Sequence, residues 1–140
     1  MSVIDLGKVR GDETELFKGT ISTQKVGSSI VLNDTINNYD YIFIQYESDS
    51  GGNFPTQIIK PSSMITKRIT VDSFNLADSK PEGAWLFEFT MTLQEDNKTL
   101  QIEKINGVKL FSTNENIDTV EFGVRFIYGI KLGGTKWLTS

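Results

Sequence analysis

The chain of 140 residues contains no cysteine and no histidine. Without cysteine it has no disulfide scaffold and no thiolate nucleophile. Without histidine it lacks the usual base of Ser-His-Asp hydrolysis and the commonest ligand of zinc, copper and haem iron. Acid–base chemistry is left to carboxylates, lysine or tyrosine, so most enzyme classes are excluded. We expect a non-enzymatic protein with no cofactor and no metal site.

Long apolar runs and clusters of basic residues are also missing. No apolar stretch approaches the roughly 20 residues that span a bilayer, and residues 1–13 lack the basic and then apolar pattern of a signal peptide. Lysine and arginine are scattered over a chain of net charge −4, with Lys67-Arg68 as their only adjacent pair. We therefore expect neither export by a signal peptide, nor membrane insertion, nor nucleic acid binding.

Apolar and aromatic residues are plentiful. Hydrophobic residues make up 38% and charged residues 23% of the chain, which is the balance of a soluble globular protein. Aromatic residues, at 11%, are frequent enough to fill sheet cores and binding surfaces. The length suits one ordinary domain, so we expect an N-terminal arm over residues 1–14 and a single domain over residues 15–140.

Residues 119–131 carry the clearest pattern in the chain. Large apolar residues occupy every second position, and the positions between them are mostly polar or small. The alternate apolar residues are Val120, Phe122, Val124, Phe126, Tyr128 and Ile130. This period of two predicts one long strand whose six apolar side chains share a single buried face.

Similar runs recur between clusters of glycine, asparagine, aspartate and serine, at the spacing of a sandwich or barrel. We expect strands over residues 15–21, 29–32, 39–47, 57–60, 63–71, 84–94, 99–105, 108–112 and 119–131. Only residues 74–79, which Pro81 follows, are compatible with a short helical turn. The sequence therefore predicts an all-β fold, an antiparallel β-sandwich.

The C-terminal half indicates a meander. Residues 84–93 alternate an apolar face with a polar one, and residues 95–98 (EDNK) form a turn cluster. The apolar face consists of Trp85, Phe87, Phe89, Met91 and Leu93, which can oppose the last strand. Asn106-Gly107 has the sequence of a tight hairpin turn, because both residues accept positive φ. We therefore expect residues 84–94, 99–105 and 108–112 to form three antiparallel strands.

Residues 39–47 allow two interpretations. Tyr41 and Phe43 share one face of the expected strand, and Ile42, Ile44 and Tyr46 share the other. Two apolar faces are typical of a central strand buried between two layers. Alternatively, one or more of these tyrosines stacks on a sugar ring. Trp137 leaves a similar choice, because it follows the last strand and either folds back on the core or meets a partner.

The segment after this strand is a glycine-rich loop. Glu47, Asp49 and Asn53 offer oxygen ligands that could suit Ca²⁺, but their spacing does not match an EF-hand loop. Gly51-Gly52 lacks the Gly-Lys-Ser/Thr context of a phosphate-binding loop. We therefore favour a solvated loop, whose Asp49 and Asn53 can form hydrogen bonds with a ligand.

Glu88 and Glu121 lie on the polar faces of two expected strands that could be sheet neighbours. A glycosidase uses two carboxylates across a cleft, one as the acid and the other as nucleophile or base. The alternative is a surface ion pair with Arg125, two residues along from Glu121. We favour the ion pair, because no other acidic residue points to a carbohydrate cleft.

Three parts of the chain carry a family resemblance: residues 3–12 (VIDLGKVRGD), residues 37–44 (NNYDYIFI) preceded by residues 29–32 (SIVL), and residues 126–131 (FIYGIK). The first resembles the leader of many tail-fibre and baseplate proteins of phages that infect Gram-positive bacteria. The other two resemble the opening and the closing strand of their C-terminal β-sandwich domains. The collagen-like Gly-x-y tract that often follows the leader is absent here.

The resemblance implies a non-enzymatic, homotrimeric virion protein with a jelly-roll-like sandwich. Such a protein is made in the host cytoplasm, joins other tail or baseplate proteins, and attaches the phage to saccharides or proteins of the cell wall. We therefore expect a tail protein that binds host saccharide through stacking platforms and hydrogen-bonding side chains. The candidate residues are Tyr41, Tyr46, Asp49, Asn53 and Trp137.

Two alternatives stay open. The first is a purely structural tail or baseplate protein whose exposed apolar surface is an oligomer interface. The second is a glycosidase that acts on cell-wall polysaccharide through Glu88 and Glu121.

Overall fold

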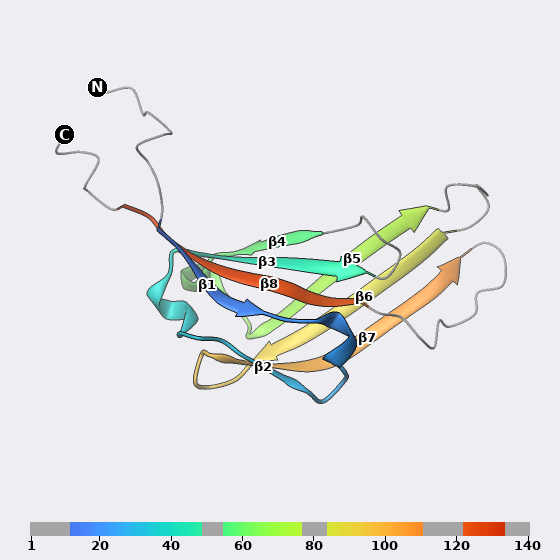
Figure 1. Ribbon diagram of the computed structural model, residues 1–140, viewed down its shortest axis with the longest axis horizontal. Helices are drawn as coiled ribbons and strands as arrows, with labels where there is room; N and C mark the ends of the chain where they lie inside the picture. The colour runs from blue at the N-terminus through green and yellow to red at the C-terminus, as the bar shows by residue number, and fades with distance from the viewer. Residues whose placement is uncertain (1–11, 49–54, 77–83, 111–121, 134–140) are drawn as a thin grey trace, which may run out of the picture.

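Eight strands form two four-stranded antiparallel sheets in the computed structural model, which describes residues 12–48, 55–76, 84–110 and 122–133 (Figure 1). The first sheet has the order β1-β8-β3-β4 and the second the order β2-β7-β6-β5. The strands of the first sheet are β1 (Asp12–Lys18), β8 (Phe122–Lys131), β3 (Tyr41–Ser48) and β4 (Thr56–Ile59). Those of the second are β2 (Ser29–Val31), β7 (Thr99–Leu110), β6 (Ala84–Leu93) and β5 (Arg68–Leu76). The predicted antiparallel β-sandwich is confirmed.

Three 3-10 turns join these strands. They are η1 (Ile21–Thr23), η2 (Ile36–Asn38) and η3 (Pro61–Ser63). Over the described ranges, no helix is long and apolar enough to cross a membrane.

The two ends of the described chain run side by side, as in a jelly roll. β1 pairs with β8 and β2 pairs with β7, so the first strand meets the last and the second meets the one before the last. The middle departs from that scheme, because β3 turns directly into β4 within one sheet and β5, β6 and β7 form a meander in the other. The fold is therefore a jelly-roll-like sandwich with a C-terminal meander.

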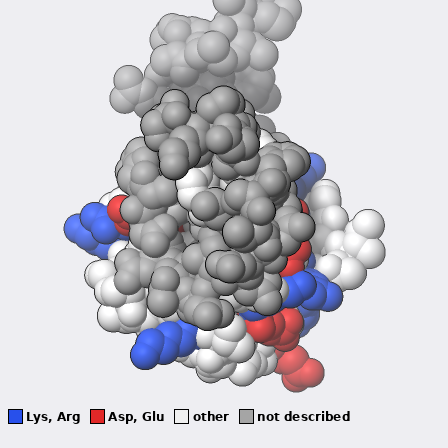
Figure 2. All heavy atoms as spheres, turned by 90° about the vertical axis from the view of Figure 1, so that its right-hand side faces the viewer, with Lys and Arg blue, Asp and Glu red and all other residues white. Residues whose placement is uncertain are grey.

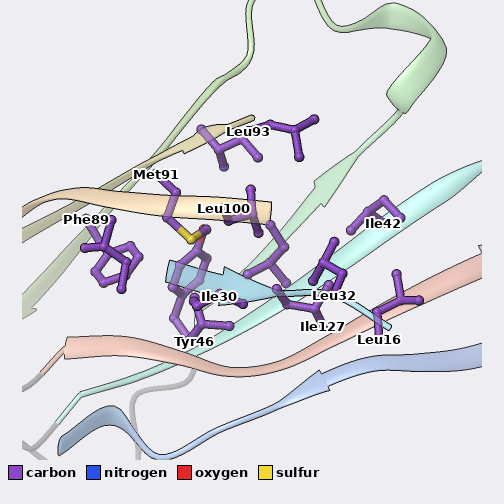
Figure 3. Close-up of a cluster of buried hydrophobic side chains, with 14 of the residues drawn as sticks. Leu16, Ile30, Leu32, Ile42, Tyr46, Phe89, Met91, Leu93, Leu100 and Ile127 are labelled. Carbon is purple, nitrogen blue, oxygen red and sulfur yellow. The ribbon is translucent and has the colours of Figure 1, made fainter. Parts of the chain in front are cut away.

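Alternate residues of both sheets meet between the layers and form one core (Figure 3). In β3 every second residue is buried, beginning with Ile42, Ile44 and Tyr46. In β6 the residues predicted to share the apolar face do so, since Phe87 and Met91 are among its buried side chains. The period of two therefore gives the correct inner face for both strands.

Aromatic rings connect the two sheets across this core. Tyr46 and Phe122 of the first sheet stack with centroids 5.7 Å apart, and Phe87 of the second sheet stacks on Phe122 at 5.8 Å. Phe89 meets Tyr46 and Phe122 edge-on, at 5.9 and 6.1 Å. Such pairs each add about 0.5–1.5 kcal/mol beyond the burial of their area. The last strand thus opposes the aromatic residues of β6, as predicted.

The apolar side chains of β8 do not share one face. Phe122 and Val124 are buried, but further along the strand Ile127 is fully buried while Phe126 and Tyr128 stay partly exposed. The prediction of a single buried face is therefore wrong beyond position 125. Residues 119–121 lie outside the described residues.

A β-bulge at Arg125 causes this change of face. Gln45 of β3 pairs with Phe126, whereas the next residue, Tyr46, pairs with Val124, so Arg125 is an extra residue in β8. Because side chains alternate with a period of two, one extra residue turns every later side chain to the opposite face. β1 contains a matching irregularity, in which Leu16 is the extra residue opposite β8.

The predicted hairpin turn at Asn106-Gly107 is wrong. β7 runs without a break from Thr99 to Leu110, and Asn106 and Gly107 pair with Glu88 and Phe87 of β6. The long strand β6 offers pairing partners along this whole length, and these outweigh the local preference for a turn. The meander consists of β5, β6 and β7 instead, and the turn between β6 and β7, residues 94–98, contains Asn97 at φ 55°.

Two further boundaries differ from the predictions. The helical turn expected over residues 74–79 is wrong for residues 74–76, which end β5 and pair with residues 84–86 of β6. β1 begins at Asp12, so residues 12–14 belong to the sheet and not to an arm. Residues 1–11 lie outside the described residues.

The buried hydroxyl of Tyr46 allows a test of this core. It donates a hydrogen bond to Oε1 of Gln57 at 2.7 Å, and burial raises the pKa of the phenol. Tyr46→Phe keeps the ring but removes the donor, so we expect a loss of about 1–2 kcal/mol in the free energy of unfolding. Tyr41→Phe, at a partly exposed position of the same strand, should change it by less than about 0.5 kcal/mol. Urea unfolding measures both, and equal losses would contradict the core position of Tyr46.

Candidate functional site

The saccharide-binding residues predicted from the sequence do not form one site. Tyr46 has no exposed surface, so no sugar can reach its ring, and its prediction as a binding residue is wrong. Tyr41 lies partly exposed on the outer face of the first sheet. Asp49, Asn53 and Trp137 lie outside the described residues.

Of the two carboxylates in the glycosidase hypothesis, the structure describes Glu88 alone. Glu88 is in β6, which belongs to a different sheet from β8, and Glu121 lies outside the described residues. Glu88 pairs with Lys104, with Nζ and Oε1 2.6 Å apart, and this hydrogen bond lowers the pKa of Glu88. Arg125 pairs with Glu47 at 3.2 Å. Glu88 and Arg125 therefore each form an ion pair, but with partners other than those predicted.

A polar hollow of about 390 Å³ opens where β1 begins and β8 ends. It is lined by Asp12, Thr14, Asp34, Asn38, Tyr39 and Lys131. These residues come from three separate segments, which the pairing of Asp12 with Lys131 and the loop around η2 bring together. Sequence reasoning missed this hollow because only the fold joins the segments.

Asp34 is the best-fixed carboxylate of the hollow. Its Oδ1 accepts hydrogen bonds from the backbone N–H of Thr35 at 2.8 Å and from Nδ2 of Asn38 at 3.0 Å. Its Oδ2 accepts one from the hydroxyl of Tyr39 at 2.9 Å. The bonds from Asn38 and Tyr39, followed by that from Thr35, hold the pKa of Asp34 below its ordinary value of 3.8. The carboxylate is therefore charged and oriented at neutral pH.

Tyr39 forms the aromatic wall of the hollow. Its ring packs on the backbone of β8 at Gly129, where an added Cβ would lie 2.5 Å from Cδ1 of the ring. A glycine at this position therefore leaves room for the ring. Burial, with a further contribution from the hydrogen bond to Asp34, raises the pKa of Tyr39. The hydroxyl therefore stays protonated and donates to the carboxylate.

This set of groups suits a ligand rich in hydroxyls. Carboxylate and amide oxygens accept hydrogen bonds, while the amide and ammonium N–H groups of Asn38 and Lys131 donate them. An aromatic ring beside such groups can pack against the C–H face of a sugar. Among the residues that the structure describes, no three acidic side chains gather closely enough to hold a metal ion.

The outer faces of the two sheets differ in character. The second sheet exposes Thr70, Asp72 and the Glu88–Lys104 pair, together with a separate apolar residue, Val31, and the apolar neighbours Phe74 and Leu86. The first sheet exposes six large apolar side chains, which we call the aromatic face: Tyr41, Phe43, Ile58, Phe126, Tyr128 and Ile130. The second layer predicted over residues 39–47 is therefore missing on this side among the described strands.

Charge is mixed at the end of the molecule that lies to the right in Figure 1. There, Figure 2 shows acidic and basic side chains of the described residues interspersed around the rim. They form no visible area of a single sign on that side.

No protein-family model matches the chain, and no curated protein matches it. The assignment of function therefore depends on the polar hollow, the aromatic face and the resemblance of short segments.

The contact between Gly129 and Tyr39 allows a test of how the hollow is built. Gly129→Ala should displace the ring of Tyr39 and lower the free energy of unfolding by about 1–3 kcal/mol. In a Tyr39→Ala background the same substitution should cost much less, because the ring that it meets is gone. Chemical unfolding of the native protein, the two single variants and the double variant completes this double-mutant cycle. Costs that agree in both backgrounds within about 0.5 kcal/mol would show that the ring does not occupy this position.

Proposed function

We propose that this protein is a non-enzymatic tail or baseplate protein of a phage or prophage, and that it binds a saccharide of the host cell surface. The observation that supports saccharide binding is the polar hollow, in which three hydrogen bonds orient the carboxylate of Asp34 beside the ring of Tyr39. The phage assignment depends on the resemblance of residues 3–12, 29–32, 37–44 and 126–131. The virion location and the homotrimer remain predictions of that resemblance, and the two-fold dimer proposed below is the alternative to the homotrimer.

The hydrogen-bonding capacity of the hollow supports this choice of ligand. Each sugar hydroxyl both donates and accepts, so it needs neighbours of both kinds. The two oxygens of Asp34 accept three hydrogen bonds within the protein, which leaves about one of their four lone-pair sites for a ligand. Asn38 uses one amide N–H on Asp34 and retains its second N–H and its carbonyl oxygen. Lys131, which also lines the hollow, supplies further donors.

The size of the hollow also fits a short saccharide. Its volume of about 390 Å³ lies near the lower end of the range of about 300–1,000 Å³ that is usual for small-molecule sites. Because the groups are held by hydrogen bonds and by packing before any ligand arrives, binding costs little ordering of the site.

The structural alternative is supported by a different observation, the aromatic face of the first sheet. A contiguous apolar surface of this kind is typical of a protein contact. The two functions are compatible, since the hollow and the aromatic face are separate surfaces. The glycosidase alternative is not favoured, because Glu88 forms an ion pair with Lys104 on the outer face of a sheet and does not line the hollow.

Substitution of the oriented carboxylate tests the proposed function. Asp34→Asn should weaken binding to Gram-positive cell-wall polysaccharide at least tenfold, measured by calorimetry or by pull-down. The matched control is Asp96→Asn. Asp96 also accepts bonds from backbone and hydroxyl donors of Lys98 and Thr99 and has a lowered pKa. It lies in the β6–β7 turn, which contacts the η2 loop through Asn97, but it does not line the hollow.

The outcomes of this test are distinct. Loss of binding in Asp34→Asn alone supports the hollow as the site. Equal binding by both variants would remove the hollow from the proposal, and a native protein that binds no cell-wall polysaccharide would overturn the function itself. Thermal unfolding of both variants shows whether each remains folded.

The pH dependence of binding gives a second test. The pKa of Asp34 is lowered below 3.8, so its charge persists as the pH falls through the ordinary range and is lost only below it. Binding should therefore stay constant from about pH 7 to about pH 4.5 and decline only in stronger acid. A decline centred between about pH 5 and 7, with circular dichroism unchanged, would mean that another group controls binding.

A further inference from the structure

The aromatic face consists of three rows of side chains that cross the first sheet. In the first row Glu13 of β1, Ile130 of β8 and Tyr41 of β3 lie side by side. The middle row contains Glu15, Tyr128, Phe43 and Ile58. The third row contains Lys18, Phe126, Gln45 and Thr56. Each row therefore has a charged residue at the β1 edge and apolar or uncharged residues across the rest of the sheet.

A face of this composition is unusual on the outside of a sandwich. The outer face of an antiparallel sheet is ordinarily polar. On the second sheet of this protein Thr70, Asp72 and the Glu88–Lys104 pair lie on that face, beside one apolar pair, Phe74 and Leu86. On the first sheet the central strands β8 and β3 place Phe43 and Tyr128 in the middle, and Ile58 beside them is 60% exposed. Isolated apolar residues are common on protein surfaces, but a contiguous group of six indicates a binding surface.

Charges of opposite sign occupy the two ends of the face. Glu13 lies in the first row near the start of β1, Lys18 in the third row at its end, and Glu15 in the middle row between them. The ammonium of Lys18 is 5.8 Å from the ring centroid of Phe126, which in turn stacks on Tyr128 at 5.7 Å. One end of the face is therefore acidic and the other basic, with the aromatic residues between them.

We propose that a second copy of this chain covers the aromatic face with its own aromatic face, about a two-fold axis that crosses the strands along the middle row. This axis lays β1 antiparallel over β1 of the second copy, so Glu13 meets Lys18 of the other chain. Tyr41 meets the amide of Gln45, and Phe43 packs on its own counterpart. The surface is thus self-complementary in charge, in hydrogen bonding and in apolar area.

The other two-fold arrangement fits less well. An axis along the strands would lay β1 over β4 of the second copy, each row over the same row, and bring the charge of Glu15 over Ile58 and that of Lys18 over Thr56. Desolvation of these charges would then have no ionic compensation. In the crossing arrangement Glu15 faces its own counterpart, but it lies at the exposed rim of the sheet, where water screens the repulsion.

The size of the face predicts a weak association. Four strands about 4.8 Å apart, crossed by three rows about 7 Å apart, give roughly 400 Å² of face on each copy. The two copies together would bury well under the 1,200–2,000 Å² or so of a typical stable interface. We therefore expect a reversible dimer whose dissociation constant is micromolar or weaker.

Sedimentation of the full chain over a range of concentrations tests the interface. The native protein should convert from monomer to dimer as its concentration rises from about 1 µM to about 500 µM. Phe43→Lys should weaken this association at least tenfold. Phe74→Lys is the matched control, because Phe74 is also an exposed apolar strand residue (53% exposed) but lies on the outer face of the second sheet, and it should leave the dimer unchanged.

A charge exchange tests the axis. Glu13→Lys and Lys18→Glu should each weaken the dimer, while the protein that carries both should recover most of the native affinity, because the two charges have only changed places. Circular dichroism confirms that each variant is folded.

Several results would overturn the proposal. One is a native protein that stays monomeric, and another is a dimer that Phe43→Lys does not weaken. A trimer would also overturn it, because in a three-fold ring the face cannot meet the same face of one partner. Failure of the double charge exchange to restore association would also overturn it. Cell-wall polysaccharide binding that is lost in Phe43→Lys would instead assign the aromatic face to saccharide, independently of the result for Asp34.

Discussion

The β-bulge at Arg125 determines which side chains of β8 enter the core. Before it, Phe122 and Val124 point inward and pack on the aromatic residues of β6. After it, Ile127 points inward and the neighbouring Phe126 is displaced to the outer face. Because β8 lies between β1 and β3, this one extra residue changes the composition of the central part of both faces of the first sheet.

Both candidate surfaces of the protein follow from this bulge. Beyond it Gly129 takes an inner position, and the absence of a side chain there leaves room for the ring of Tyr39, whose hydroxyl orients Asp34. With unbroken alternation, Tyr128 would occupy an inner position and Gly129 an outer one. The same bulge places Tyr128 on the outer face beside Phe43. The hollow and the aromatic face are therefore two consequences of one irregularity in the sheet.

The sequence predicted the regular parts of this fold and missed what depends on distant pairing. The inner faces of β3 and β6 follow from alternation, because each of these strands keeps one period along its apolar residues. Alternation also exists in β8, but the bulge depends on how many residues β3 places opposite it, which local sequence does not reveal. Asn106-Gly107 likewise has a turn sequence, and pairing with β6 overrides it. The hollow combines three distant segments, so no local pattern in the sequence predicted it.

The most direct test of this account is the orientation of neighbouring side chains in β8. Because the chain contains no cysteine, a single introduced thiol can be labelled without interference. Phe126→Cys and Ile127→Cys should be treated with a thiol reagent in dilute solution, where copies do not associate. The bulge predicts that the thiol at position 126 reacts at least tenfold faster than that at position 127, because position 127 is fully buried. A faster reaction at position 127 would indicate that side chains of β8 alternate without a bulge, and it would contradict both candidate surfaces.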